Sequence, residues 1–322
     1  MAIKKIAVLT SGGDAPGMNA AIRAVTRAAL FKGVEVVGVY RGYVGLMSGD
    51  FVPMTMRSVS DIIQRGGTIL YSARSHEFHT EEGMQKAIAQ CRAHGIEGVV
   101  VLGGDGSFRG AQDLTRRGLP CVGLPCTIDN DISCCEHTIG YDTALNTAME
   151  MIDKLRDTSM SHDRCSVVEV MGREAGYLAL NVAVAVGAIS VLVPEIQHDF
   201  QRDVIDRIRA AALTGKKHFI VLVAEGVGGV LEMAPQIEKA TGFETRATIL
   251  GHVQRGGSPS VYDRVLASRM GHYAVELLLA GQSNRVVTVQ NDRLMDFDIE
   301  EALRMKKPFD EHLFRVAQEL SM

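Results

Sequence analysis

The sequence contains no tryptophan, only 8 prolines among 322 residues, and no apolar run long enough to cross a membrane. Its most apolar stretch, residues 178–193, is interrupted by Asn181, Gly187 and Ser190. It ends before Pro194, short of the ~18–20 apolar residues that a span requires, so we interpret it as a buried helix followed by a buried strand. The first residues lack the ~7–15-residue apolar core of a signal peptide, and we expect a cytoplasmic protein with no membrane contact.

Metal-binding cysteine spacings and an excess of charge are also missing. The six cysteines form no C-x-x-C pair, so neither a zinc knuckle nor a disulfide framework is indicated. We expect buried, reduced thiols at positions 91, 121, 126, 134, 135 and 165. His76 and His79 stand three residues apart without a nearby third ligand, so we expect no metal there. The net charge of -4 gives no general attraction to nucleic acid, so any bound anion must be held locally.

What the sequence does contain is an alternation of short apolar runs with helical stretches. At 322 residues with 46% hydrophobic side chains, the chain is long enough for about two domains with their own cores. The alternation predicts α/β domains with mainly parallel sheets that are covered by helices on both faces. We expect buried strands at residues 6–9, 34–39, 99–102, 121–124, 167–170, 189–193, 219–224 and 286–289, and helices around residues 22–29 and 143–160.

Three polar loops follow predicted strands, where parallel sheets place their ligands. Residues 10–17, TSGGDAPG, put glycines before a helix, where backbone amides can approach a phosphate. Residues 102–107, LGGDGS, put a carboxylate between glycines, which suits a partly hydrated Mg²⁺. Residues 125–131, PCTIDND, supply Asp129 and Asp131, one able to accept a hydroxyl proton while the other helps to hold metal. A tight turn, a helix cap or solvated acids would explain any one loop; together the three favour a phosphate-handling site.

Four arginines near strand or turn boundaries extend this set. A guanidinium presents its donors in a fork that matches two phosphate oxygens at once. Each arginine taken alone is more simply a solvated surface group. The four are Arg164, Arg173, Arg246 and Arg255.

The assembled motifs resemble the bacterial ATP-dependent 6-phosphofructokinase family. TSGGDAPGMNAAIR, RGGT with YSAR, GGDGS, TIDND, IGYDTA, RDTS with SH, VVEVMGR, ETRAT and GHVQRGGSP occur in the family's order along nearly the whole chain. The resemblance implies two Rossmann-like three-layer domains with the chain crossing between them. It assigns residues 1–140 plus 258–307 to the nucleotide and residues 141–257 plus 308–322 to the sugar phosphate. It also implies a homotetramer that phosphorylates the 1-hydroxyl of fructose 6-phosphate with ATP.

Residue by residue, the resemblance implies a complete active site. Asp129 would be the general base, Thr127 and Arg173 would steady the transferring phosphoryl group, and Asp105 would hold Mg²⁺ with help from Asp131. Nucleotide contacts would come from Gly13, Tyr43, Arg74, Ser75, Gly104, Asp105, Gly106 and Ser107. Sugar-phosphate contacts would come from Thr127, Asp129, Met171, Gly172, Arg173, Glu225, His252 and Arg255, and from Arg164 and Arg246 of a neighbouring subunit.

Two other functions stay open at this point. A pyrophosphate-dependent relative typically carries Asp at the position of Gly106 and Lys at that of Cys126, and this chain has neither. The ATP-dependent enzymes usually carry Gly where this chain has Cys126, so a thiol would stand near the nucleotide. A non-catalytic metabolite-binding subunit would be expected to lose Asp129 or Asp105, and both are present.

The resemblance also implies an effector site for an anion such as ADP or phosphoenolpyruvate at a subunit interface. Its candidate residues are Arg23, Arg27, Arg57, Asp61, Arg156, Lys216, Lys217 and His218. Where family members place an acid that helps to hold the effector's metal ion, this chain has Ile189, and where they place Arg and Lys it has Met56 and Thr214. We therefore expect ADP activation to be weak.

Overall fold

The computed structural model describes residues 3–321 and divides the chain into two compact α/β units. The first comprises the residues through Ile128, Ile132–Thr143 and Arg255–Lys307. The second comprises Asp129–Asp131, Ala144–Gln254 and the residues from Pro308 onward. The chain thus passes repeatedly between two α/β units, in agreement with the fold class predicted from the sequence. Which ligand each unit takes stays a prediction.

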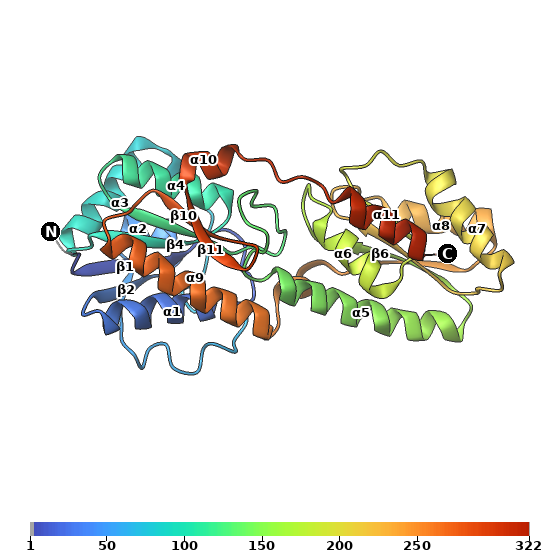
Figure 1. The fold of residues 1–322 in the computed structure, drawn as a ribbon, viewed down its shortest axis with the longest axis horizontal. Coiled ribbons are helices and arrows are strands. Elements are labelled where there is room, and N and C mark those ends of the chain that lie inside the picture. The colour runs from blue at the N-terminus through green and yellow to red at the C-terminus, as the bar shows by residue number, and fades with distance from the viewer. Residues whose placement is uncertain (1–2, 322) are drawn as a thin grey trace. The chain divides into compact units, whose positions relative to one another are not determined.

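The first unit is built on a seven-stranded sheet with the order β11-β10-β5-β4-β1-β2-β3 (Figure 1). The five inner strands run parallel, and the two edge strands, β3 and β11, pair antiparallel with their neighbours. All side chains of β4 and β5 are buried, because helices cover both faces of the sheet. The strands are β1 (Lys5–Thr10), β2 (Glu35–Val39), β3 (Phe51–Met54), β4 (Gly98–Gly103), β5 (Cys121–Pro125), β10 (Arg285–Gln290) and β11 (Arg293–Asp298).

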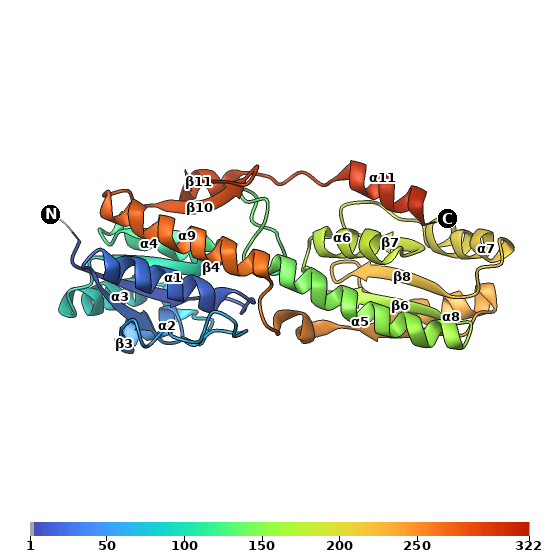
Figure 2. The same cartoon turned by 60° about the horizontal axis from the view of Figure 1, so that its bottom comes forward.

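Helices cover both faces of this sheet. α1 (Met18–Phe31) and α9 (Val261–Leu279) pack along each other on one face, as Figure 2 shows. α1 begins after Gly17 and ends just before Gly33, whose φ of +76° lies in the left-handed region that glycine accepts readily. The other helical elements of this unit are α2 (Tyr43–Ser48), a 3₁₀ turn at Glu77–His79, α3 (Glu81–Ala93), α4 (Asp105–Arg116) and α10 (Ile299–Arg304).

The second unit has a four-stranded parallel sheet with the order β7-β8-β6-β9. Its strands are β6 (Cys165–Val170), β7 (Ser190–Leu192), β8 (Phe219–Ala224) and β9 (Thr245–Ile249). Its helical elements are α5 (Tyr141–Ser161), whose first residues belong to the first unit, α6 (Tyr177–Val186), a π-helical turn at Gln201–Ile205, α7 (Asp206–Leu213), α8 (Val230–Thr241), a 3₁₀ turn at Gly251–Arg255 and α11 (Glu311–Leu320). One apolar core lies between the sheet and the α7–α8 side, where Val167, Phe219 and Val221 meet Ile208 and Ile237. α6 and α11 pack against each other and against β7.

All eight predicted buried strands are present, and three further strands were not predicted. β3, β9 and β11 lie at sheet edges, where one side of the strand has no neighbour. Edge strands carry polar or partly exposed residues, such as the sequence RLMDFD of β11, and they tolerate Pro53 in β3. A search for continuous apolar runs therefore misses these three strands, whereas it finds β7, an edge strand whose residues are all buried.

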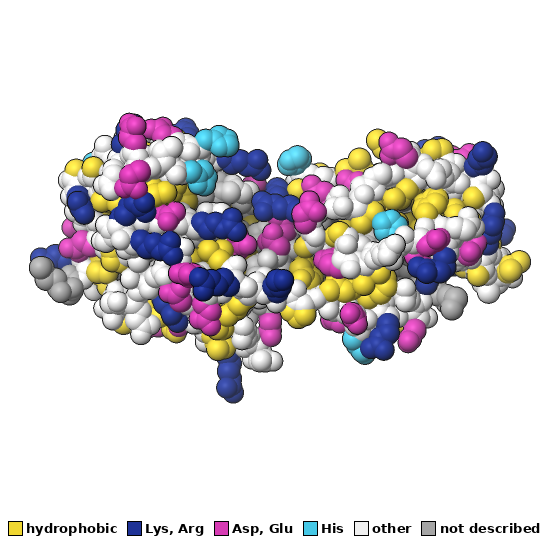
Figure 3. Space-filling view, turned by 90° about the horizontal axis from the view of Figure 1, so that it is seen from above, with side chains coloured by type: hydrophobic (Ala, Val, Ile, Leu, Met, Phe, Trp, Pro, Cys, Tyr) yellow, Lys and Arg dark blue, Asp and Glu magenta, His cyan; other side chains and the backbone are white. Residues whose placement is uncertain are grey.

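All six cysteines are free and buried, as expected. No helix within residues 3–321 combines the length and the apolar character that a membrane span needs. On the face shown in Figure 3, basic and acidic side chains are interspersed over each unit.

Candidate active site

Three loops leave the carboxyl ends of three neighbouring strands in the first unit. β1, β4 and β5 lie side by side in parallel, and each ends in one of the motifs singled out in the sequence. Ser11 N donates to Leu102 O at 2.9 Å, and Cys126 N donates to Gly103 O at 3.0 Å. The fold therefore gathers the starts of all three motifs at one edge of the sheet, where α/β proteins bind ligands.

Glycines allow the first two loops to pack closely. A Cβ at Gly103 would lie 2.5 Å from Ser11 O and would also collide with the Ser107 side chain. Gly104 is the residue before α4 and has no side chain with which to cap the helix. The first amides of α4 therefore keep their partial positive charge available for an anion.

The beginning of α4 also leaves room for a ligand. Asp105 and Gly106 are its first two residues. A Cβ at Gly106 would meet no heavy atom of the described residues within 4 Å. Gly106 therefore stands beside open space at the helix N-terminus, and its contact with a nucleotide stays a prediction.

Tyr43 supports this region from inside the unit. Its ring stacks on Phe78 with the centroids 4.0 Å apart, and its hydroxyl donates to Ser107 O at 2.5 Å. Burial raises the pKa of the Tyr43 hydroxyl well above its ordinary value. Tyr43 is only 6% exposed, so it holds the first turn of α4 in place and offers little surface to a ligand.

The segment with Arg74 and Ser75 is tied to the first glycine loop. Ser75 Oγ accepts a hydrogen bond from Phe78 N at 3.1 Å, and Arg74 is exposed. Ser72, which the sequence did not single out, donates from Oγ to Gly12 O at 2.6 Å. Arg74 and Ser75, both predicted to contact the nucleotide, therefore follow Ser72, which is hydrogen-bonded to the glycine loop at residues 10–17.

The paired carboxylates belong to the second unit. Asp129 is fully buried, and Arg173 Nε lies 3.2 Å from its Oδ2. Arg173 Nη1 lies 3.8 Å from Asp131 Oδ2, so one guanidinium faces both acids. Asn130 has a φ of +52° and Arg173 a φ of +53°, a left-handed conformation that is uncommon for arginine. Backbone strain of this kind is concentrated at functional sites.

The turn that carries Arg173 is held by the ends of neighbouring segments. Glu225 Oε2 accepts hydrogen bonds from Gly172 N at 3.2 Å and from Arg173 N at 3.0 Å. Gln254 Oε1 accepts from Met171 N at 2.9 Å, and Gln254 is fully buried. Gln254 was not among the predicted site residues, although it lies between two of them.

Arg164 and Arg246 lie together, at the opposite end of the second sheet. Arg164 Nε is 2.9 Å and Arg246 Nη2 is 3.0 Å from the carboxylate of Glu244. These two arginines lower the pKa of Glu244. Arg164 precedes β6 whereas Arg173 follows it, and this six-residue strand spans about 20 Å. The pair is therefore separated by the length of the sheet from the Asp129–Arg173 pair of the same chain.

The remaining predicted contacts fall into both units. Thr127 is buried in the first unit, where its N donates to Ile139 O at 3.1 Å. Arg255 also lies in the first unit, and its Nη1 donates to Asp14 O at 3.2 Å. A side chain at Gly13 would collide with this guanidinium. His252 belongs to the second unit and is exposed.

The predicted effector residues of the second unit form a cationic cluster. Burial and then Arg156 lower the pKa of Lys216, and burial, Arg156 and Lys216 lower the pKa of His218. Lys217 lies 3.7 Å from Asp163. The positive charges of Arg156, Lys216 and protonated His218 repel one another, and a bound anion would relieve this repulsion.

The predicted effector residues of the first unit lie in two segments, α1 and the segment after β3. Burial and Arg27 lower the pKa of Arg23, which shares a face of α1 with it. Arg57 and Asp61 are exposed in the segment after β3. Ile189 lies in the apolar core of the second unit and offers no group to a metal ion.

The carboxylates fit a loosely held Mg²⁺ better than a protein-caged metal. Among residues 3–321 no three His, Cys, Asp or Glu side chains gather as metal ligands. Mg²⁺ usually keeps several waters and takes one or two carboxylates together with substrate phosphates. Asp105 at the α4 N-terminus has the chemistry for such a role.

Comparison with known proteins agrees with this arrangement. A curated relative from Brevibacillus brevis named ATP-dependent 6-phosphofructokinase is 58% identical over 320 residues, which covers 99% of this chain and 100% of the relative. A relative of the same name from Bacillus mycoides is 56% identical with the same coverage. The solved structure of phosphofructokinase from Saccharomyces cerevisiae superimposes with a TM-score of 0.87 at 35% identity. It matches 98% of this chain, which spans 46% of the yeast chain.

The family assignment covers most of the chain. The family described as phosphofructokinase matches residues 5–278, a range that contains every motif of the candidate site. The chain belongs to the phosphofructokinase family.

Proposed function

We propose that this chain transfers the γ-phosphoryl group of ATP to the 1-hydroxyl of fructose 6-phosphate and releases fructose 1,6-bisphosphate and ADP. The observation that carries the proposal is the buried Asp129 carboxylate 3.2 Å from Arg173, in a loop that follows β5. Full-length identity of 58% to a relative named ATP-dependent 6-phosphofructokinase supports the same reaction.

Asp129 acts as the general base in this proposal. A buried carboxylate can accept the proton of the attacking hydroxyl as the oxygen–phosphorus bond forms. Arg173 pairs with Asp129 before substrate binds and then meets the charge of the transferring phosphoryl group, together with Thr127. The Glu225 carboxylate keeps the backbone of Arg173 in the conformation that aims the guanidinium at Asp129.

Nucleotide and metal bind at the loops of the first unit. The first-turn amides of α4 and the glycines at positions 13, 104 and 106 receive the phosphates. Asp105, assisted by Asp131, would hold Mg²⁺. The bound ion would supply positive charge that offsets the negative charge of the phosphates during transfer.

The sugar phosphate binds to the second unit and to a second copy of the chain. Met171, Gly172, Glu225, His252 and Arg255 contact the sugar within a subunit. Arg164 and Arg246 lie at the other end of β6 from Asp129, so they serve the site of a neighbouring subunit, where they bind the 6-phosphate. A homotetramer provides that neighbour.

ATP is the donor in this proposal. The space beside Gly106 leaves room for a nucleoside. Cys126 is buried, and burial raises the pKa of its thiol well above the ordinary value, so it provides no cation for pyrophosphate. A non-catalytic binding subunit is disfavoured, because Asp105 and Asp129, which such a subunit would be expected to lose, are both present. The reaction would take place in the cytoplasm, under the control of an anionic effector bound to the cationic clusters.

A coupled assay tests the reaction directly. The protein is supplied with fructose 6-phosphate, Mg²⁺ and either ATP, GTP or pyrophosphate, and formation of fructose 1,6-bisphosphate is followed with aldolase. We expect the highest kcat/KM with ATP. A higher kcat/KM with pyrophosphate would contradict the choice of donor, and no product with any donor would contradict the proposed function.

A further inference from the structure

A buried carboxylate joins the beginnings of two long helices behind the candidate site. Asp263 lies in the first turn of α9 and is fully buried. Its Oδ1 accepts a hydrogen bond from Gly140 N at 2.8 Å, just before α5. Its Oδ2 accepts from Thr143 N at 2.8 Å and from Thr143 Oγ1 at 2.5 Å. A residue of α9 therefore caps the amino end of α5.

The capping is reciprocal. Thr143 Oγ1 accepts a hydrogen bond from Ser260 N at 2.9 Å, at the amino end of α9. Asp142 Oδ2 accepts from Ser260 Oγ at 2.5 Å. Two helix N-termini, each with partial positive charge, thus share one buried carboxylate. We call Asp142, Thr143, Ser260 and Asp263 the helix latch.

The latch fixes a segment that pairs with the active-site loop. Ile139 N donates to Pro125 O at 2.9 Å, and Thr127 N donates to Ile139 O at 3.1 Å. Thr138 Oγ1 donates to Thr127 O at 2.6 Å. Cys126 and Ile139 therefore form a parallel β-bridge, and the latch holds the bridged segment at Gly140.

The same segment supports the first glycine loop. A Cβ at Gly140 would lie 2.7 Å from Ala15 Cβ, and a Cβ at Gly17 would lie 2.6 Å from Ile139 Cγ2. Such close packing leaves little room for the segment to move relative to residues 15–17. One buried carboxylate therefore lies behind two of the loops that carry candidate site residues.

We propose that Asp263 is a positioning residue for phosphoryl transfer: by holding Gly140 and Thr143 it fixes the segment that is hydrogen-bonded to Thr127, and with Thr127 the start of the loop that leads to Asp129. The proposal rests on the proposed function, since it concerns how these two residues are placed. Asp263 itself contacts neither substrate nor the reacting atoms. Small misplacement of a catalytic group reduces kcat while leaving most binding contacts intact.

Replacement of Asp263 by asparagine tests the proposal. The carboxamide has a single acceptor oxygen, whereas three donors face the native carboxylate, so at least one donor loses its partner. We expect Asp263→Asn to lower kcat about ten- to hundred-fold, with KM for fructose 6-phosphate and for ATP changed less than about three-fold. The matched control is Asp298→Asn, which alters a carboxylate that caps α10 through Glu300 N at 2.8 Å. It should lose stability but keep kcat within about two-fold.

A second pair of variants does not depend on Asp263→Asn being folded. Thr143→Ser keeps the hydroxyl that donates to Asp263 and accepts from Ser260, whereas Thr143→Val removes it. We expect Thr143→Ser to retain kcat and Thr143→Val to lower it about ten-fold without a matching rise in KM. The proposal is overturned if Thr143→Ser and Thr143→Val lose kcat equally, or if folded Asp263→Asn keeps kcat within two-fold. An unmodified protein that makes no fructose 1,6-bisphosphate would instead refute the proposed function.

Discussion

At the scale of single residues, the chemistry depends on what surrounds the Asp129 carboxylate. Arg173 Nε lies 3.2 Å from its Oδ2, and Arg173 Nη1 lies 3.8 Å from Asp131 Oδ2. In the proposed function the buried Asp129 accepts the hydroxyl proton, and the exposed guanidinium of Arg173 stabilises the charge of the phosphoryl group.

Asp129→Asn should abolish most of the activity. The amide keeps the size and one hydrogen-bond acceptor of the side chain but cannot take up the hydroxyl proton. We expect kcat to fall by ~10²–10⁴ while KM for fructose 6-phosphate changes only a few-fold. Steady-state kinetics with ATP check this, and denaturant unfolding of the variant controls for loss of structure. Retention of more than about a tenth of the original kcat would be incompatible with Asp129 as the base.

Asp263 should make the stability of the protein depend on pH. Burial raises its pKa to about 6, against hydrogen bonds from Thr143 and Gly140 that lower it, and Asp142 adds to the rise. Cys126 and Tyr262 are the other titratable groups that feel this charge. In the unfolded chain the pKa of Asp263 returns to about 4, so the native state binds its proton first as the pH falls.

The free energy of unfolding contributed by Asp263 therefore rises as the pH falls from about 7 to about 5, by roughly 1 kcal/mol. It decreases again as the pH rises through the native pKa. Urea unfolding of the native sequence and of Asp263→Asn at both pH values isolates this contribution, because the asparagine does not titrate. A difference between the two proteins that stays constant with pH, or grows with rising pH, would contradict the assignment.

At the scale of elements, the sequence predicts strands that are continuous apolar runs better than it predicts polar strands at a sheet edge. The eight predicted strands are apolar runs, and all are present: seven are inner strands, whose two faces a parallel sheet buries, and the eighth is the buried edge strand β7. The sequence did not predict β3, β9 and β11, because a strand at the edge of a sheet can form without a continuous apolar run. The three site loops were likewise visible, since each sets glycines or acids directly after a buried run.

Residues that position the site were not visible in the sequence, for a physical reason. Asp263, Gln254 and Ser72 all bond to backbone groups, which carry no sequence signal. Their partners lie 123, 83 and 60 residues away along the chain. Only the folded chain brings such groups together.

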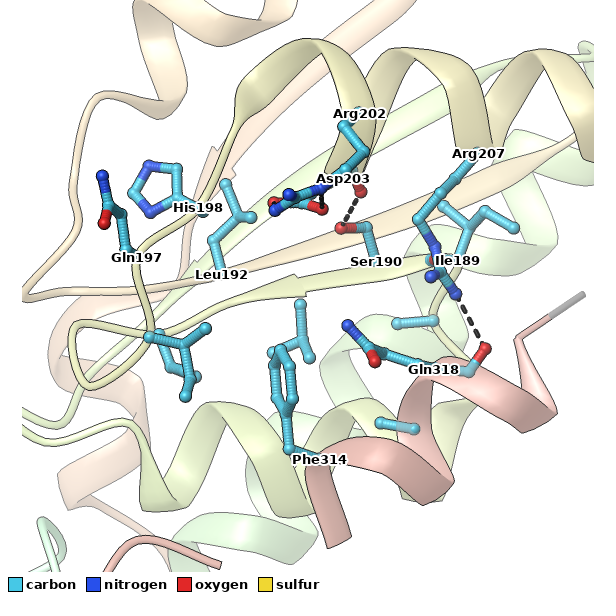
Figure 4. A pocket seen from close by; sticks show the side chains of 15 residues that line it. Ile189, Ser190, Leu192, Gln197, His198, Arg202, Asp203, Arg207, Phe314 and Gln318 are labelled. Carbon is cyan, nitrogen blue, oxygen red and sulfur yellow. Dashed lines mark hydrogen bonds and ion pairs between the residues drawn. The ribbon is translucent and has the colours of Figure 1, made fainter. Parts of the chain in front are cut away.

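Arg207 joins three elements of the second unit and should contribute strongly to its stability. In Figure 4 its guanidinium reaches across a small pocket to Gln318 in α11. Nε donates to Ile189 O at 2.9 Å and Nη2 to Gln318 O at 2.9 Å, and a further bond reaches Ser321. The side chain thereby ties α7 to the start of β7 and to the end of α11.

We expect Arg207→Met to lower the free energy of unfolding by about 2–3 kcal/mol, because the carbonyls of buried Ile189 and of Gln318 lose a charged donor. Arg202→Met is the matched control, since Arg202 is 70% exposed and pairs with Asp203, its neighbour in sequence. That variant should cost no more than about 0.5 kcal/mol. Denaturant unfolding of the two variants measures this difference. Equal losses of unfolding free energy in the two variants would show that Arg207 does not hold α11.

At the scale of the whole molecule, one chain does not contain a complete site in the proposed function. Arg164 and Arg246 share Glu244 at one end of β6, while Asp129 and Arg173 meet beyond its other end. Since the strand spans about 20 Å, no side chain can bridge the two positions within this unit. If Arg164 and Arg246 bind the 6-phosphate, as the proposed function holds, they do so in the site of another copy, and activity should then require the oligomer.

Mixed oligomers test this sharing of sites. Loss of a charged partner of the 6-phosphate costs ~1.5–3 kcal/mol, so Arg246→Ala should raise KM for fructose 6-phosphate about 10–100-fold. Asp129→Asn subunits lack the base but retain Arg246. When the two variants are dissociated together and reassembled, some sites combine an intact Asp129 with an intact Arg246, and these should restore activity at low fructose 6-phosphate.

The matched control mixes Asp129→Asn with Arg173→Ala. Both substitutions affect groups that meet within one chain, 3.2 Å apart, so no reassembled site contains both native residues. Activity should therefore appear in the first mixture and stay at the level of the parents in the second. Recovery in neither mixture, once reassembly is verified by sedimentation, would place Arg246 outside the neighbouring site, and equal recovery in both would mean that Asp129 and Arg173 do not act in the same site.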